Sequence, residues 1–246
     1  MRSATLLLRR QSGGGSATAL LLYAGRLSPE KNLALLIDVM ERLTSPAKFK
    51  STGRQMGASP DCRLLIAGSG PLEGWLREQA RRLGGRLRLL GHLCNRDEMA
   101  RLLASVDVFV HPNPREPFGI GPFEAMASGT PLVAPDAGGV LDYADSTCAW
   151  PAKPEGGTFT DTVHEVLSNP PEARTKVQRA RRRGALRLAK GHWPILRHLR
   201  DLSRPPGNPR RAQDWGRDAL NPPWVAVARK GLRYYSGGSA VCAGVC

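Results

Sequence analysis

The sequence lacks any apolar run long enough to cross a membrane. A transmembrane helix needs about 20 consecutive apolar residues, and no stretch of this chain approaches that length. The run from Leu6 to Leu8 is shorter than the apolar core of a secretory signal peptide. We therefore expect a cytoplasmic protein rather than an integral membrane or secreted one.

Cysteine is also scarce, and no two cysteines have the Cys-x-x-Cys spacing of zinc and redox sites. The five residues of this type are Cys62, Cys94, Cys148, Cys242 and Cys246. A disulfide framework or a zinc site is therefore disfavoured, and the thiols are expected to be reduced.

The net charge of +15 is unevenly distributed along the chain. Residues 173–246 contain 17 Lys and Arg against three acidic residues, whereas residues 1–172 contain 19 against 18. The body of the protein is thus nearly neutral, which argues against a nucleic-acid-binding module. A basic tail is typical of a solvated segment, and peripheral contact with an anionic membrane is the other interpretation that stays open.

Composition divides the chain into three parts. Residues 1–18 include Gly-Gly-Gly-Ser and are expected to form a flexible leader. Residues 19–202 have the pattern of a globular domain, interrupted at 44–61 by a segment too long for an ordinary connection. Residues 203–246 are rich in Arg, Pro and Gly, and they are expected to form a basic, disordered tail.

Apolar runs alternate with segments of helical periodicity within the globular part. Strands are predicted at 20–23, 63–67, 87–90, 108–110, 132–134 and 148–150. Helices are predicted at 31–43, 71–83, 97–106, 122–128 and 138–143, with further helices to about residue 202. Because the strands are continuously apolar, they indicate a parallel sheet that is covered on both faces. The fold class is α/β, a doubly wound Rossmann-like sheet, in which ligands bind at the carboxyl ends of the strands.

The loop after the first strand carries two cations. It reads Gly-Arg-Leu-Ser-Pro-Glu-Lys-Asn, and it places Arg26 and Lys31 beside the start of the next helix, after a turn at Gly25. Cations next to a helix N-terminus at a strand end are typical of a pyrophosphate site. On their own, they are also typical of a solvated surface.

The loop after the second strand, Gly-Ser-Gly-Pro, contains Gly68 and Gly70. It is not a dinucleotide fingerprint, because Glu73 stands where the third glycine would be and Pro71 interrupts the pattern. Its glycines would still allow a ligand to approach the backbone closely.

Two carboxylates flank a glycine-rich helix start after the fourth strand. Glu116 and Glu124 are separated by seven residues, and Gly119 and Gly121 lie between them. Backbone N–H groups at such a helix start can face an anion, and carboxylates accept hydrogen bonds from sugar hydroxyls. His111, at the end of the preceding strand, is interpreted as a structural polar residue, with general-base chemistry as the alternative.

These segments together resemble the signature motifs of glycosyltransferase family 4, the group 1 glycosyltransferases. The resemblance rests on Glu-Pro-Phe-Gly-Ile-Gly-Pro-Phe-Glu-Ala-Met-Ala-Ser-Gly-Thr-Pro-Leu-Val, on Gly-Arg-Leu-Ser-Pro-Glu-Lys-Asn and on Ile-Ala-Gly-Ser-Gly-Pro-Leu. It implies the C-terminal, donor-binding domain of a GT-B fold. It also implies transfer of a hexose from a nucleoside-diphosphate sugar with retention at the anomeric carbon.

The resemblance also implies roles for particular residues. Arg26 and Lys31 would hold the diphosphate, and Glu116 would contact the transferred sugar; these three are the expected catalytic residues. The remaining donor-binding residues would be Gly25, Gly68, Gly70, Phe118, Gly119, Ile120 and Glu124, with Glu124 on the ribose. No metal or other cofactor is expected, which agrees with the lack of an Asp-x-Asp motif.

The family's N-terminal acceptor domain has no counterpart in this sequence. Only about 19 residues precede the first predicted strand, so we expect a donor-binding domain without the N-terminal acceptor domain, and a separate chain that supplies this domain is a candidate partner. Three alternatives stay open: a non-catalytic or truncated sugar-nucleotide binder, an epimerase or a phosphorylase on the same scaffold, and, least favoured, a nucleic-acid-binding module.

Overall fold

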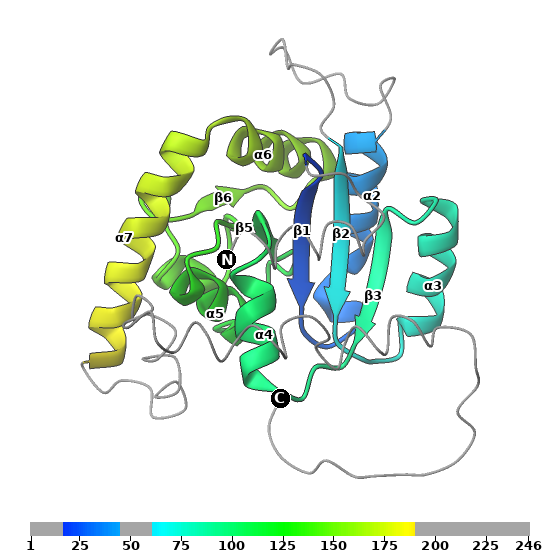
Figure 1. Ribbon diagram of the computed structural model, residues 1–246, viewed down its shortest axis with the longest axis horizontal. Coiled ribbons are helices and arrows are strands. Elements are labelled where there is room, and N and C mark those ends of the chain that lie inside the picture. Colours follow the sequence, from blue (N-terminus) through cyan, green and yellow to red (C-terminus); the bar gives the residue numbers. More distant parts are fainter. Residues whose placement is uncertain (1–16, 45–60, 190–246) are drawn as a thin grey trace, which may run out of the picture. The chain divides into compact units, whose positions relative to one another are not determined.

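The computed structural model describes residues 17–44 and 61–189, which form a six-stranded parallel sheet flanked by helices (Figure 1). The strands, in chain order, are β1 (Ala19–Ala24), β2 (Cys62–Ala67), β3 (Leu87–Gly91), β4 (Val108–Val110), β5 (Leu132–Pro135) and β6 (Trp150–Ala152). Their spatial order is β3-β2-β1-β4-β5-β6, and every neighbouring pair is parallel. The prediction of a doubly wound parallel sheet is therefore confirmed, and its order is that of a Rossmann fold.

Helices pack on both faces of this sheet. They are η1 (Pro29–Lys31), α2 (Leu33–Thr44), α3 (Glu73–Arg82), α4 (Arg96–Leu103), α5 (Ile120–Ser128), η2 (Gly139–Asp142), α6 (Gly156–Ser168) and α7 (Pro170–Ala189). One core cluster joins alternate residues of the strands, such as Leu21 and Tyr23, to the buried faces of α2 and α6. The other alternate residues, such as Leu20 and Leu22, are equally buried. Since successive side chains of a strand point to opposite faces, both faces of the sheet are covered.

Several element boundaries differ from the predictions. Helix α2 begins at Leu33 rather than Lys31, because Asn32 adopts a left-handed backbone conformation (φ 54°) that closes the 3-10 turn η1. Helix α4 ends at Leu103, three residues early. Strand β6 begins two residues after the predicted 148–150.

Some sequence predictions lie outside the described residues. These are the leader up to residue 16, the insertion at 45–60, and the boundary between the domain and its basic tail. Within residues 17–44 and 61–189, no helix is both long and apolar enough to cross a bilayer.

Candidate functional site: the carboxyl edge of the sheet

Strands β1 and β4 are neighbours at the centre of the sheet, although 83 residues lie between the end of β1 and the start of β4 in the sequence. The crossovers from β1 run toward β3 on one side and those from β4 run toward β6 on the other. The loops that follow these two strands therefore meet at the topological switch point, where doubly wound folds bind ligands. These loops are residues 25–32 and 111–119.

The glycine-rich loop after β2 packs directly against the loop after β1. The amide of Leu27 donates to the Ser69 carbonyl at 2.9 Å, and the Leu27 carbonyl accepts from the Leu72 amide at 2.9 Å. A Cβ at Gly70 would stand 2.5 Å from the Leu27 oxygen, and one at Gly68 would collide with the Gly25 carbonyl. The structure thus explains both glycines by the close approach of two backbones. Their predicted contact with a donor stays a prediction.

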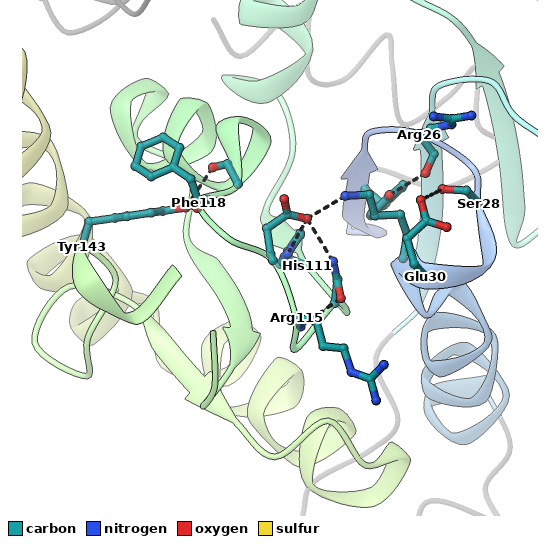
Figure 2. Close-up of polar contacts among 12 residues, drawn as sticks. Arg26, Ser28, Glu30, His111, Arg115, Phe118 and Tyr143 are labelled. Atoms are coloured by element: carbon teal, nitrogen blue, oxygen red, sulfur yellow. Dashed lines mark hydrogen bonds and ion pairs between the residues drawn. The ribbon is translucent and has the colours of Figure 1, made fainter. Parts of the chain in front are cut away.

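Arg26 projects from the first loop as an exposed side chain. Its backbone carbonyl accepts a hydrogen bond from the hydroxyl of buried Tyr23 at 2.9 Å, which anchors the turn beneath it. Burial raises the pKa of Tyr23, so this hydroxyl keeps its proton and remains a donor. In Figure 2 the Arg26 side chain points away from His111. Arg26 is therefore held at the rim of the site.

Lys31 and Glu116 form an ion pair across the two loops. Lys31 Nζ lies 2.8 Å from Glu116 Oε2, and the two side chains are 22% and 14% exposed. The Asn113 side-chain amide donates to the same oxygen at 3.1 Å (Figure 2). Burial opposes the charge of Glu116, but these two hydrogen bonds and the nearby cation outweigh it, so the pKa of the carboxyl lies below its usual value. The carboxylate is thus ionised and firmly held.

His111 lies beneath this pair with its side chain only 4% exposed. Its Nε2 is 3.8 Å from Glu116 Oε2, beyond hydrogen-bond distance. Neither ring nitrogen meets the distance and angle of a hydrogen bond to another described residue, although the backbone of Asn113 lies near enough to favour the protonated form. Burial lowers the pKa of His111 to about 4, although Glu116 favours the protonated form. The imidazole is therefore neutral near pH 7.

Asn32 links the same two loops from the other side. Its left-handed conformation places the side-chain amide 3.1 Å from the Pro112 carbonyl, to which it donates. Neither Asn32 nor Asn113 was predicted to be a site residue. The signal for Asn32 was its place at the end of a cationic loop, where asparagine tolerates positive φ better than most residues.

The N-terminus of α5 opens onto this edge of the sheet. The helix begins at Ile120 with Gly119 as its N-cap, at φ 80°, and no described side chain caps it. Gly121 lies inside the first turn rather than before it, which corrects the predicted start at residue 122. A Cβ there would stand 3.0 Å from the Ala24 carbonyl, so Gly121 lets the helix start against the end of β1.

Tyr143 contacts the backbone of the two residues that precede α5. Its buried hydroxyl lies 2.7 Å from the Phe118 carbonyl and 2.9 Å from the Gly119 carbonyl (Figure 2). The Phe118 ring packs on Tyr143 and Phe123, at centroid distances of 5.2 and 5.8 Å. Tyr143 was predicted only as the last residue of a short helix, with no role in the site. Its contact with residues 118–119 fixes the backbone where the predicted donor contacts lie.

Glu124 lies one turn into α5, half-buried, and four residues after the exposed Ile120. Residues four apart share one face of a helix. Glu124 and the N-terminus of α5 can therefore serve one ligand. Among the described residues, no three His, Cys, Asp or Glu side chains gather so as to hold a metal ion.

Comparison with known proteins identifies the class of this chain. A mannosyltransferase of Mycobacterium tuberculosis, named as a GDP-mannose-dependent alpha-(1-6)-phosphatidylinositol dimannoside mannosyltransferase, is 33% identical over 174 residues, which cover 70% of this chain and 42% of the relative. The Anabaena protein HepE, solved with UDP and glucose, superposes with a TM-score of 0.63 at 23% identity, over 81% of this chain and 52% of HepE. The C-terminal domain of a group 1 glycosyl transferase of Francisella tularensis superposes with a TM-score of 0.57 at 15% identity, over 73% and 92%.

The fold is the Rossmann-like half of a GT-B glycosyltransferase. More particularly, the chain belongs to the group 1 glycosyl transferases, whose family model matches residues 7–183. The chain spans less than half the length of the mannosyltransferase that it resembles.

Proposed function

We propose that this chain binds a nucleoside-diphosphate sugar at the carboxyl edge of its sheet, as the donor-binding half of a retaining glycosyltransferase. The observation that carries the proposal is the meeting of Lys31 and Glu116, 2.8 Å apart, in the loops at the switch point of a group 1 glycosyl transferase sheet. A sugar nucleotide has two parts that suit this arrangement. Its diphosphate attracts cations and helix amides, and its sugar hydroxyls suit a carboxylate.

In this proposal Arg26, Lys31 and the free amides of α5 hold the diphosphate, with Gly25, Gly68 and Gly70 shaping the loops beside it. Glu116 accepts from hydroxyls of the transferred hexose, and Glu124 accepts from the ribose. Phe118, Gly119 and Ile120 contribute backbone contacts between the two. The acceptor is held by a second domain, as the family resemblance implies.

The reaction breaks the bond between the anomeric carbon and the β-phosphate oxygen and forms one to an acceptor hydroxyl oxygen, whose proton passes to the departing diphosphate or to solvent. Negative charge grows on the departing diphosphate while the anomeric carbon becomes cation-like. Cations and helix N–H groups stabilise the negative charge on the diphosphate, and a nearby carboxylate stabilises the cation-like anomeric carbon. No metal ion is needed for this division of roles.

Retention is proposed from the relatives. The name of the mycobacterial mannosyltransferase pairs GDP-mannose with an alpha-(1-6) product. Because GDP-mannose carries its mannose in the α configuration, an α product means that the configuration is kept. The neighbour solved with UDP and glucose adds that uridine and guanosine donors both deserve testing.

The test is calorimetry of the chain with UDP-glucose, GDP-mannose and ADP-glucose. We expect one of them to bind, and Glu124→Ala to weaken that binding by about 1–3 kcal/mol, the usual loss for hydrogen bonds to a charged group. Glu165→Ala, which removes an exposed carboxylate from α6, is the matched control and should bind like wild type. Unchanged affinity in a folded Glu124→Ala protein would remove Glu124 from the site. Failure of all three donors to bind the folded wild type would contradict the proposal.

A further inference from the structure

One oxygen of Glu116 gathers three polar side chains from two loops. Lys31 Nζ lies 2.8 Å from Glu116 Oε2, and Asn113 Nδ2 lies 3.1 Å from the same oxygen. His111 Nε2 lies 3.8 Å from it. The first two are hydrogen bonds and the third is not. His111 is therefore a third polar side chain near this oxygen that does not yet form a hydrogen bond with it.

Once a sugar nucleotide is bound, the Lys31 ammonium interacts with two anions, the diphosphate and Glu116. In the proposed function the Lys31 ammonium also serves the diphosphate, which carries about two negative charges against one on Glu116. The ammonium sits on a flexible stem, so it can move toward the stronger anion. Glu116 then loses part of its strongest contact at the moment when its carboxylate has to be aimed at the sugar.

His111 lies close to the same oxygen of Glu116. A buried polar group without a partner is costly, and a specific one in a folded protein calls for an explanation. Its pKa of about 4 makes the ring neutral near pH 7, and a neutral imidazole carries one N–H donor, which faces Glu116 in the tautomer that holds the proton on Nε2. A shift of less than about 1 Å would bring Nε2 from 3.8 Å to the usual hydrogen-bond distance of ~3.0 Å.

We propose that His111 is a positioning residue that takes over the hold on Glu116 when the donor diphosphate engages Lys31. The proposal rests on the proposed function, and it goes beyond it by giving a role to a residue that does not itself touch the donor. His111 acts through Glu116, so its effect falls on the sugar part of the donor and not on the diphosphate.

The experiment is calorimetry with two probes: whichever of UDP-glucose, GDP-mannose and ADP-glucose binds wild type best, and the matching nucleoside diphosphate without its sugar. His111→Leu removes the N–H at similar volume. We expect it to weaken sugar-nucleotide binding about tenfold, equivalent to ~1.4 kcal/mol, and to change binding of the nucleoside diphosphate less than about twofold. His111→Gln, whose amide Nε2 reaches a similar place, should restore most of the lost affinity.

A second comparison tests the route through Glu116. In a Glu116→Ala background, His111→Leu should add less than about a twofold loss, because two residues acting as one unit are not additive. A further tenfold loss there would mean that His111 touches the donor itself, and it would overturn the positioning role. Equal losses for both probes would show a merely structural residue, as would failure of a folded His111→Gln protein to restore affinity. Wild-type affinity in His111→Leu would also overturn the inference while leaving the proposed function intact.

Failure of wild type to bind any of the three sugar nucleotides would overturn the proposed function, and the role of His111 with it. The two failures are therefore distinguishable. Thermal melting of each variant establishes that it is folded before its affinity is interpreted.

Discussion

At the scale of single residues, the two predicted diphosphate cations occupy different environments. Arg26 is an exposed side chain at the rim, whereas Lys31 is held against Glu116 with about a fifth of its surface exposed. The ion pair holds both side chains in place, and an incoming anion would compete with Glu116 for Lys31. Lys31 therefore links the diphosphate and the sugar parts of the proposed site.

His111 should also make stability depend on pH. Its pKa is about 4 in the folded chain and 6.5 for an ordinary histidine. Between these values the unfolded chain takes up a proton that the folded chain does not, so stability is lost as pH falls below 6.5 and the loss levels off near pH 4. The expected loss from this group is about 2 kcal/mol at pH 5 relative to pH 7.

Urea unfolding of wild type and His111→Gln at pH 7 and pH 5 measures this contribution. The drop in unfolding free energy should be smaller in the variant by about 2 kcal/mol, because glutamine does not titrate. Comparing the two proteins cancels the other titrating groups. The same drop in both would contradict the low pKa of His111.

The contacts of individual residues were only partly predictable. Arg26, Lys31, Glu116 and Glu124 stand out in the sequence because they fall within the segments that resemble the family's signature motifs. The ion pair between Lys31 and Glu116 could not be predicted in this way, because it joins residues 85 apart and depends on how two loops meet. The buried position of His111 near that pair, without a hydrogen bond to it, depends on the same loop geometry.

At the scale of elements, the loop after β2 gives a test of packing. Gly70 lies against the backbone of Leu27, with a Cβ position 2.5 Å from its carbonyl oxygen, so Gly70→Ala should cost about 1–3 kcal/mol or more of folding free energy. Gly74, four residues on in α3, has no described atom within 4 Å of its Cβ position.

Gly74→Ala is therefore a matched control. It should stabilise the protein by up to about 1 kcal/mol, because alanine loses less backbone entropy than glycine when this second residue of α3 becomes ordered. Chemical unfolding of both variants measures the two changes. If Gly70→Ala were as stable as wild type, the close approach of the two loops would be wrong.

Element types were easier to predict than their ends. Strand β4 matches its predicted bounds, because Val-Phe-Val is a short apolar run followed by His-Pro. Helix α5 starts two residues before its predicted start, since Pro122 can occupy a first helical turn as well as begin it. Helix α2 starts later than predicted because Asn32 adopts a left-handed backbone conformation. The hydrogen bond from its side chain to the Pro112 carbonyl stabilises this conformation, and the periodicity of the sequence does not reveal it.

At the scale of the whole molecule, alternating strands and helices predicted the fold class but not the strand order. Continuous apolar runs imply burial on both faces. They do not say that β4 lies beside β1 rather than beside β3, because that adjacency comes from a crossover reversing direction across the sheet. The position of the proposed site follows from this reversal, which brings the loops 25–32 and 111–119 together.

The central claim is that this edge of the sheet holds the donor. The most direct test is a crystal structure of the chain with the sugar nucleotide that it binds best. Our account predicts the diphosphate against Lys31 and the first amides of α5, the ribose hydroxyls on Glu124, and the hexose on Glu116. A nucleotide bound elsewhere would contradict it, for example in the cavity of about 260 Å³ beside Pro131 and Arg174, at the amino ends of the strands.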